Sequence, residues 1–380
     1  MAGLLGKMAS MLGRGGGAAG MDRRPDEPLR VGYVLWDYPT LSQSFVHSEI
    51  KWLVGHGVDV VVYHKAKPDK EAVLDYKVDS FIIKGVGDLL ALVRKHGRHL
   101  LHSHFAYPTA TLFTWPVAEA AGIPFTLMPH AVDIFQYENM KKNRLGEMAR
   151  SAWCKAVFAL GPFHRDFFIS QGVPPEKIII KPNSLEPRWF EEGFEVADRP
   201  IRRAVFIGRF VEKKGVPDII AVARRVTDLD VTFDIYGYGP LAARITEEAK
   251  TARNVNLKIG GMPNDECRRV MKGADLFFLP CVRAGDGDMD GLPTVFMEAA
   301  AMGVPVLTSN LSSIPALVKD GETGFVCAPG DLDCYEARIR GLAGRSLKEL
   351  EPMLLAARTR LVDDFHPDAV HKRLLDSWLS

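Results

Sequence analysis

The sequence predicts an α/β protein built from two Rossmann-like domains in tandem. Its 380 residues suggest two domains, at roughly 100–200 residues per domain. Short apolar runs alternate with longer amphipathic stretches, and the same rhythm restarts after a polar segment near the middle of the chain. Continuous apolar strands that alternate with helices indicate a parallel sheet covered on both faces.

The first domain is expected at residues 29–190. Its first apolar run, 29–36, is followed by an expected helix at 42–57 that ends in glycine. Further strands are expected at 58–64, 78–84, 99–105, 124–130, 154–161 and 177–183, with helices between them.

The second domain is expected at residues 202–362. The polar, proline-bracketed stretch 184–200 predicts the connection, with the linker itself at 191–201. Residues 363–380 are expected to form a final amphipathic helix that returns to the first domain. Strands are expected at 202–208, 231–237, 254–261, 275–281, 304–309 and 323–327.

Composition excludes several classes of protein. The chain has 48 basic and 47 acidic residues, a net charge of +1, which argues against a general nucleic-acid binder. No apolar run reaches the ~18 residues of a transmembrane helix. Five scattered cysteines without a CxxC pair predict reduced, buried thiols in a cytoplasmic protein. Residues 1–28 are expected to be a disordered leader, with a weak amphipathic membrane contact as the alternative.

Ligands of doubly wound sheets bind outside the carboxyl ends of the strands, so the loops after strands are expected to carry the chemistry. One such loop is GRFVEKKG at 208–215, where Gly208, Arg209 and Lys214 follow a strand and precede a helix. Two cations and backbone N–H groups at such a turn suit a diphosphate. Two solvated surface cations are the alternative.

The most informative stretch is RAGDGDMDGLPTVFMEAAAMGVPVLTS at 283–309, an acidic, glycine-rich loop that leads from a strand into a helix. The N-terminus of that helix offers free N–H groups and a positive dipole end to an anion. Asp290 lies at the end of the loop, and Glu298 lies two turns further on. DGDMDG also matches the start of a calcium loop, but position 12 of that pattern is Met297 rather than a carboxylate.

Two histidine motifs lie on or at the end of predicted strands of the first half. PHAVD at 129–133 places His130 and Asp133 three residues apart where a strand meets the cleft, so that they could contact a sugar or a developing charge. HSHF places His102 and His104 on one face of a strand. Zinc needs at least one more ligand, and none is evident nearby in the sequence, so the cleft wall or the core is the expected place for this pair.

The turn after the first strand is rich in hydroxyl and amide groups: Thr40, Ser42, Gln43 and Ser44. Helix capping explains one of them, and the others suit hydrogen bonds to a polyhydroxylated ligand. Neither this turn nor YGYGP at 236–240 has the G-x-G-x-x-G spacing of a dinucleotide site, which weakens the hypothesis of an NAD enzyme.

Taken together, these motifs resemble family 4 glycosyltransferases with the GT-B fold, two Rossmann-like domains that face each other across a cleft. The resemblance covers about residues 29–379 and rests on FIGRFVEKKG, IYGYGP and the pair Asp290…Glu298. The YPTLS turn and the GDMDG loop are most similar to the colanic-acid and exopolysaccharide branch. The resemblance implies a retaining transferase that uses a nucleotide-diphosphate sugar, with no metal and no other cofactor.

The resemblance also implies residue roles. His130 would sit beside the anomeric centre and Asp290 would contact the donor sugar. Arg209 and Lys214 would bind the diphosphate, and these four residues are the catalytic candidates. The expected donor-binding residues are Gly208, Arg209, Lys214, Gly237, Gly291, Leu292, Pro293, Thr294 and Glu298, the last on the ribose. The expected acceptor-binding residues are Thr40, Ser42, Gln43, His104 and Asp133.

Two departures from the family pattern stand out. Asp290 occupies a position where the family usually has glutamate, and its side chain is one methylene shorter. The usual Gly-Gly turn after the first strand is replaced by residues 38–44, which makes Ser42 and Gln43 candidates for contacts to the donor phosphates.

The expected partners are a nucleotide sugar and a glycan, lipid-linked or small-molecule acceptor. The expected setting is exopolysaccharide or related glycan biosynthesis, in the cytoplasm or at the inner face of the membrane. Three alternatives stay open: a glycosyltransferase of small natural products, a nucleotide-sugar epimerase or sugar–sugar-phosphate synthase, and a non-catalytic sugar-nucleotide-binding protein.

Overall fold

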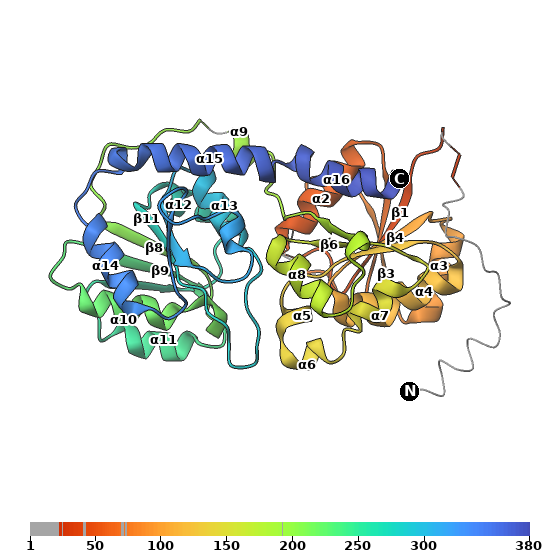
Figure 1. Cartoon of the computed structure of the whole chain (residues 1–380), viewed down its shortest axis with the longest axis horizontal. Coiled ribbons are helices and arrows are strands. Elements are labelled where there is room, and N and C mark those ends of the chain that lie inside the picture. The colour runs from red at the N-terminus through yellow and green to blue at the C-terminus, as the bar shows by residue number, and fades with distance from the viewer. Residues whose placement is uncertain (1–22, 25, 41–42, 70–71, 73, 192) are drawn as a thin grey trace.

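The computed structural model describes residues 23–24, 26–40, 43–69, 72, 74–191 and 193–380. It has two lobes, each built around its own sheet (Figure 1). The first lobe holds a seven-stranded sheet in the order β3-β2-β1-β4-β5-β6-β7, and the second holds a six-stranded sheet in the order β10-β9-β8-β11-β12-β13. The predicted α/β class is confirmed. Ser42 and most of the expected leader at 1–28 lie outside the described residues.

Every apolar run that predicts a strand contains one, with ends that differ by a few residues. The first sheet consists of β1 (Arg30–Leu35), β2 (Asp59–His64), β3 (Asp79–Ile82), β4 (Leu100–His104), β5 (Phe125–Met128), β6 (Cys154–Ala159) and β7 (Ile178–Ile180). The second sheet consists of β8 (Arg203–Arg209), β9 (Thr232–Tyr238), β10 (Val255–Ile259), β11 (Leu276–Leu279), β12 (Val306–Ser309) and β13 (Phe325–Cys327).

Helices lie between the strands. Those of the first lobe are α2 (Ser44–Gly55), α3 (Val86–Lys95), the π-helical η1 (Ala106–Thr114), α4 (Trp115–Ala121), α5 (Val132–Phe135), α6 (Tyr137–Met140), α7 (Leu145–Arg150), α8 (Pro162–Ser170) and η2 (Pro175–Lys177). The connection carries α9 (Arg188–Glu191). The second lobe and the tail hold η3 (Glu212–Lys214), α10 (Val216–Arg225), α11 (Ala242–Ala249), α12 (Asn264–Lys272), α13 (Thr294–Ala301), η4 (Ile314–Ala316), α14 (Leu332–Leu342), η5 (Leu347–Leu350), α15 (Glu351–Phe365) and α16 (Pro367–Leu379).

The last two helices tie the lobes together. α15 runs along the second lobe and α16 continues over the first, so that the C-terminus lies on the lobe that begins the chain (Figure 1). Trp378 is fully buried in the same core cluster as Val31 and Tyr33 of β1. Its indole Nε1 donates to the hydroxyl of Thr126, at 3.0 Å. The tail is therefore part of the core of the first lobe.

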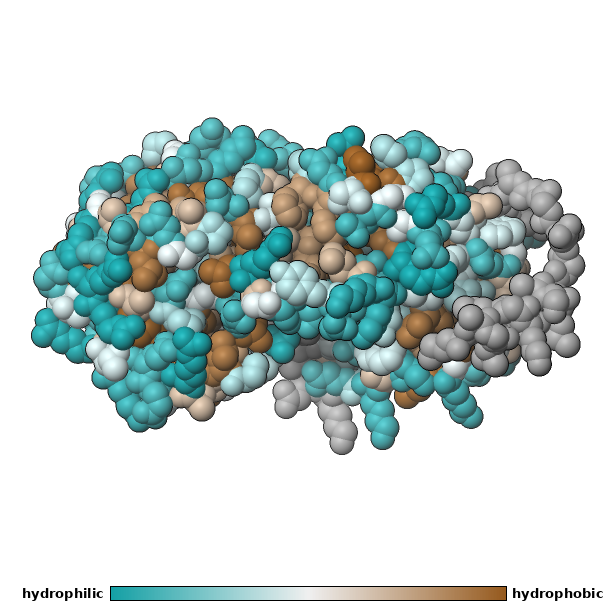
Figure 2. Space-filling view, turned by 60° about the horizontal axis from the view of Figure 1, so that its bottom comes forward, coloured by the Kyte–Doolittle hydropathy of each residue, from teal (hydrophilic) through white to brown (hydrophobic). Residues whose placement is uncertain are grey.

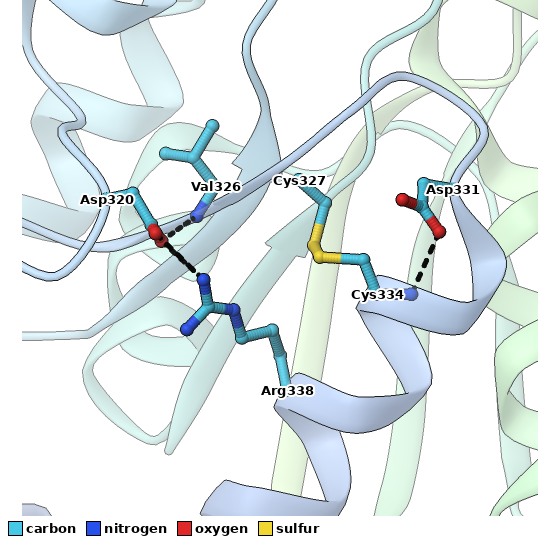
Figure 3. The surroundings of a disulfide bond; sticks show 6 residues. All are labelled: Asp320, Val326, Cys327, Asp331, Cys334 and Arg338. Atoms are coloured by element: carbon cyan, nitrogen blue, oxygen red, sulfur yellow. Dashed lines mark hydrogen bonds and ion pairs between the residues drawn. A yellow bond between two sulfur atoms is a disulfide. The ribbon is translucent and has the colours of Figure 1, made fainter.

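Cys327 and Cys334 form a disulfide, so the prediction of reduced, buried thiols is wrong for this pair. Cys327 ends β13 and Cys334 lies in the first turn of α14 (Figure 3). The carboxylate of Asp331 accepts a hydrogen bond from the Cys334 N–H, at 2.9 Å, and fixes the start of that helix. The turn between β13 and α14 brings together two cysteines that are seven residues apart. The lack of a CxxC pair in the sequence therefore does not exclude a disulfide here.

Within the described residues, no helix combines the length and the apolar character needed to cross a membrane. One face of the molecule is largely hydrophilic, with apolar groups interrupted by polar ones (Figure 2).

Candidate active site

A pocket of about 440 Å³ lies between the lobes and is lined by loops that follow strands of both sheets. The first lobe contributes Asp37, Gln43, Phe45, Phe105, His130, Ala131, Val132, Leu160 and Asn183. The second lobe contributes Arg209, Val211, Lys213, Lys214, Asp290, Gly291, Leu292, Pro293, Thr294 and Val295. Among the predicted site residues, the fold brings together Gln43, His130, Arg209, Lys214, Asp290, Gly291, Leu292, Pro293 and Thr294.

Glu298 lies in an adjoining hollow of about 170 Å³, which shares Thr294 and Val295 with the main pocket. It projects from α13 one turn beyond Thr294. Burial raises the pKa of Glu298 to about 7, although the guanidinium of Arg188 acts in the opposite direction. The side chain therefore titrates near neutral pH in a hollow that adjoins the main pocket.

Two lysines from the turn after β8 meet the acidic loop. Lys214 Nζ lies 2.6 Å from Asp290 Oδ2. Lys213 Nζ lies 2.8 Å from Asp288 and 3.5 Å from Asp290. Burial alone would raise the pKa of Asp290, but Lys214 and Lys213 outweigh it and hold the pKa below its usual range. Asp290 is therefore an anion flanked by two ammonium groups.

Arg209 and the start of α13 complete the cationic side of the pocket. Arg209 is the last residue of β8 and is exposed. α13 begins at Thr294, directly after Pro293, and both residues line the pocket. The first N–H groups of a helix have no partner within the helix, so this turn offers donors and a positive dipole end to an anion.

His130 forms the wall of the pocket on the side of the first lobe. Its ring packs between Phe45 and Phe105, with centroids 4.7 and 4.8 Å away. Its Nε2 lies 2.8 Å from Nδ1 of His104. Burial lowers the pKa of His130 well below its usual value, so His130 is neutral at physiological pH.

Three residues predicted to bind the acceptor lie off the pocket surface. The carboxylate of Asp133 accepts hydrogen bonds from the backbone N–H groups of Ala106 and Ala131, at 2.6 and 2.9 Å, and so shapes the loop after β5. Burial raises its pKa to about 6. His104 is fully buried behind His130. The hydroxyl of Thr40 is also buried, without a hydrogen bond within the described part of the chain.

Gly208 and Gly237, predicted to bind the donor, also lie away from the pocket lining. They face each other in the pairing of β8 with β9. A Cβ on Gly237 would lie 1.9 Å from the carbonyl oxygen of Gly208. The glycines therefore permit a close approach of the two strands beneath the cation-bearing turn.

The acidic loop also contacts the first lobe. The Tyr137 N–H donates to the Asp286 carbonyl at 2.9 Å, and the side-chain amide of Gln136 donates to the Asp286 carboxylate at 2.8 Å. Gly287 has φ of +89°, and a Cβ there would lie 2.6 Å from the Tyr137 ring. Met289 is fully buried in the core cluster of the first lobe. The residues that precede Asp290 in the loop therefore anchor it against the opposite lobe.

His164 makes a second bridge between the lobes. Its Nε2 lies 2.8 Å from the carbonyl oxygen of His130, and its Nδ1 lies 2.7 Å from the hydroxyl of Ser313. The Ser313 N–H in turn donates to the Gly291 carbonyl, at 3.1 Å. The two sides of the pocket are thus connected by hydrogen bonds through one buried imidazole.

One group among the described residues offers three metal-ligand atoms close together. Glu49, His102 and His104 place ligand atoms within 4.8 Å of one another. Lys181 Nζ, however, lies 2.5 Å from Oε2 of Glu49 and is equally buried. Because this ammonium already balances the carboxylate, the donor set does not favour a cation. The sequence shows the histidine pair but not that α2 brings Glu49 to it.

The sequence interpretation missed several residues of the cleft. Lys213 was overlooked beside Lys214, although the adjacent lysines of EKK were a visible signal. Phe45 of α2 lines the cleft, and Glu49, one helical turn further along the same face of α2, is buried against His104. Phe105 and Asn183 follow β4 and β7, so their positions just after strands were the signal for them.

Comparison with known proteins gives matches in both halves of the chain. Residues 42–188 match the family model Glycosyltransferase Family 4, and residues 201–344 match the model Glycosyl transferases group 1. The structure of HepE from Anabaena in complex with UDP-glucose shares the fold, with a TM-score of 0.74 and 14% identity over 92% of this chain and 99% of that one.

Two curated relatives come from polysaccharide pathways. The amylovoran biosynthesis glycosyltransferase AmsK of Erwinia amylovora is 28% identical over 65% of this chain and 61% of its own length. The putative colanic acid biosynthesis glycosyltransferase WcaL of Salmonella typhimurium is 30% identical over 54% of this chain and 52% of its own length. The match thus spans between about half and three fifths of these relatives. The chain belongs to the group 1, family 4 glycosyltransferases, with the GT-B fold.

Proposed function

We propose that this protein is a retaining glycosyltransferase that moves a sugar from a nucleoside-diphosphate sugar to a glycan or glycoconjugate acceptor. One observation carries the proposal: Lys214, Arg209 and the first turn of α13 line the same pocket as His130 of the opposite lobe. Cations and helix N–H groups together bind a diphosphate and stabilise the charge it gains as the leaving group.

The donor then follows the cleft. Its diphosphate lies against Lys214, Arg209 and the start of α13. Its ribose enters the adjoining hollow, where the ionised carboxylate of Glu298 accepts hydrogen bonds from the hydroxyls. Its sugar lies between Asp290 and His130, which face the main pocket from opposite lobes.

We also propose that transfer needs no metal ion. The leaving diphosphate meets two lysines, one arginine and a helix N-terminus, and this amount of positive charge replaces the role that a divalent cation plays elsewhere. The same lysines pair with the carboxylates of the acidic loop, so the loop is a poor calcium site.

The acceptor side belongs to the first lobe. Asp37, Gln43 and Phe45 line the pocket opposite the cations, and Gln43 Nε2 donates to Asp37 at 2.9 Å. We assign acceptor binding to the domain at 29–190 and donor binding to the domain at 202–362. The names of AmsK and WcaL support a role in extracellular polysaccharide biosynthesis, with transfer in the cytoplasm or at the inner face of the membrane.

A thermal-shift panel tests the proposal: UDP, GDP, ADP, TDP and their sugars, each with and without EDTA. A ligand that binds only the folded state raises the melting temperature by mass action. The expected result is stabilisation by one base family, unaffected by EDTA and lost in Glu298→Ala. The shift should be followed by sugar transfer from that donor to a polysaccharide-type acceptor. No shift from any nucleotide would overturn the donor site, and a shift lost in EDTA would overturn metal independence.

A further inference from the structure

A buried chain of hydrogen bonds leads from the core of the first lobe to the cleft. Lys181 Nζ lies 2.5 Å from Oε2 of Glu49. Oε1 of Glu49 lies 2.9 Å from His104 Nε2, and His104 Nδ1 lies 2.8 Å from His130 Nε2. The first three residues are at most 1% exposed, and only His130 reaches the pocket.

Proton positions along this chain follow from its charged end. The pKa of Glu49 is held well below its usual value, because the Lys181 ammonium and the hydrogen bond from His104 outweigh the effect of burial. Its carboxylate can only accept, so His104 Nε2 carries a proton. Tyr33, His102 and His371 also face this carboxylate. Lys181 already supplies one full positive charge, and a second cation at His104 would be buried without compensation.

With its ring proton on Nε2, facing Glu49, His104 accepts the proton of His130 Nε2 at its Nδ1. The other ring nitrogen of His130, Nδ1, makes no hydrogen bond with any described residue. Phe45 and Phe105 pack against the ring.

We propose that Glu49 is a positioning residue that, through His104, keeps Nδ1 of His130 unprotonated and available in the cleft as a hydrogen-bond acceptor. This rests on the proposed function, in which His130 lies beside the donor sugar. An unprotonated Nδ1 accepts a hydrogen bond from an O–H group of the donor sugar or of the acceptor substrate. The opposite tautomer would present an N–H there instead. The wrong tautomer of a catalytic histidine can lower kcat severely while the geometry is preserved.

Glu49→Gln makes the sharpest test. Lys181 only donates, so the amide oxygen of the new side chain stays at Lys181 and the NH₂ group faces Tyr33 and His104. His104 Nε2 must then accept, its proton moves to Nδ1, and His130 Nε2 becomes the acceptor. The variant thus inverts the tautomer of His130, with the proton on Nδ1.

A matched pair of variants covers the case in which Glu49→Gln does not fold. His104→Phe removes the link to His130. His102→Phe makes the same change on the same strand. Nε2 of His102 lies 3.6 Å from Oε1 of Glu49, the carboxylate that His104 also contacts. Within the described part of the chain, the hydrogen bond of His102 joins its Nδ1 to the Thr126 hydroxyl, at 2.8 Å, and does not lead to His130.

The measurement is the long-range ¹H–¹⁵N spectrum of histidine-labelled protein, with the His130 signals assigned by their loss in His130→Asn. We expect an unprotonated Nδ1 in the wild type and in His102→Phe, a protonated Nδ1 in Glu49→Gln, and a tautomer mixture in His104→Phe. We also expect kcat to fall about ten- to a hundredfold in Glu49→Gln and His104→Phe, with KM for the donor changed less than about threefold.

A protonated Nδ1 in the wild type would overturn the proposal, as would an unchanged His130 spectrum in Glu49→Gln and His104→Phe. Equal losses of kcat in His104→Phe and His102→Phe would show a merely structural role and overturn it too. The spectra need no substrate, so they decide the tautomer even if no nucleotide sugar supports transfer, a result that would instead overturn the proposed function.

Discussion

The ammonium group of Lys214 lies 2.6 Å from the carboxylate of Asp290, so two residues proposed to hold the donor are ion-paired with each other. Asp290 is flanked on its other oxygen by Lys213, at 3.5 Å. A diphosphate that binds Lys214 must therefore compete with this carboxylate or share the lysine with it. Because Lys214 is shared in this way, the contact of the donor sugar with Asp290 is coupled to the binding of the leaving diphosphate.

Asp290→Asn should separate these two roles. Loss of the negative charge frees Lys214, so the nucleoside diphosphate should bind as tightly as in the wild type or more tightly. Transfer should fall, because the donor sugar loses its carboxylate partner. Calorimetric titration with the diphosphate and initial rates with its sugar measure the two effects, and weaker binding of the bare diphosphate would contradict the coupling.

Lys214→Ala and Arg209→Ala should each remove ~2–4 kcal/mol of transition-state stabilisation, comparable to the loss of an oxyanion donor. The measured quantity is kcat/KM for the donor. Lys250→Ala, on the exposed side of the same lobe, is the control and should leave it unchanged. A loss of less than tenfold in both site variants would refute the assigned role.

Met289→Ala should affect both stability and catalysis. The fully buried side chain lies in the core cluster of the first lobe, so its truncation should cost about 2–5 kcal/mol of unfolding free energy. It should also lower kcat, because the loop that carries Asp290 loses its anchor. Met271→Ala, equally buried in the core of the second lobe, should lose stability but keep kcat; urea unfolding and initial rates compare the two.

Glu298 should make donor binding depend on pH. Burial raises its pKa to about 7, and the ionised carboxylate makes the stronger hydrogen bonds to ribose hydroxyls. Affinity for the nucleotide sugar should rise as the pH increases through about 7. The raised pKa also means that the stability Glu298 contributes is present at low pH and is lost as the pH rises through about 7. Glu298→Gln should flatten both profiles, and unchanged profiles would contradict the assignment.

The disulfide should be visible in a thiol count. The unreduced, denatured protein should show the three thiols of Cys154, Cys267 and Cys281; all five cysteines should react after reduction. Closing so short a loop is worth about 2 kcal/mol of unfolding free energy by chain entropy, so Cys334→Ser should lower the melting temperature. Five reactive thiols before reduction would disprove the bond.

The sequence by itself determined the α/β class, the strands and the loops that carry the cations and the acidic motif. These features are local: a buried strand reads as a continuous apolar run, and a phosphate-binding turn shows its glycines and cations in one short stretch. Arg209, Lys214, Asp290 and Thr294 could therefore be recognised, and the topology of a parallel sheet places them at one edge.

Only the tertiary structure decided how these residues are paired and supported. Met289 lies in the core of the opposite lobe, Glu49 of α2 reaches His104 of β4, and His164 joins His130 to Ser313. Each contact joins segments tens to hundreds of residues apart in the chain. Their side chains meet because of how helices pack on sheets and how one lobe packs on the other, and no local pattern records that packing.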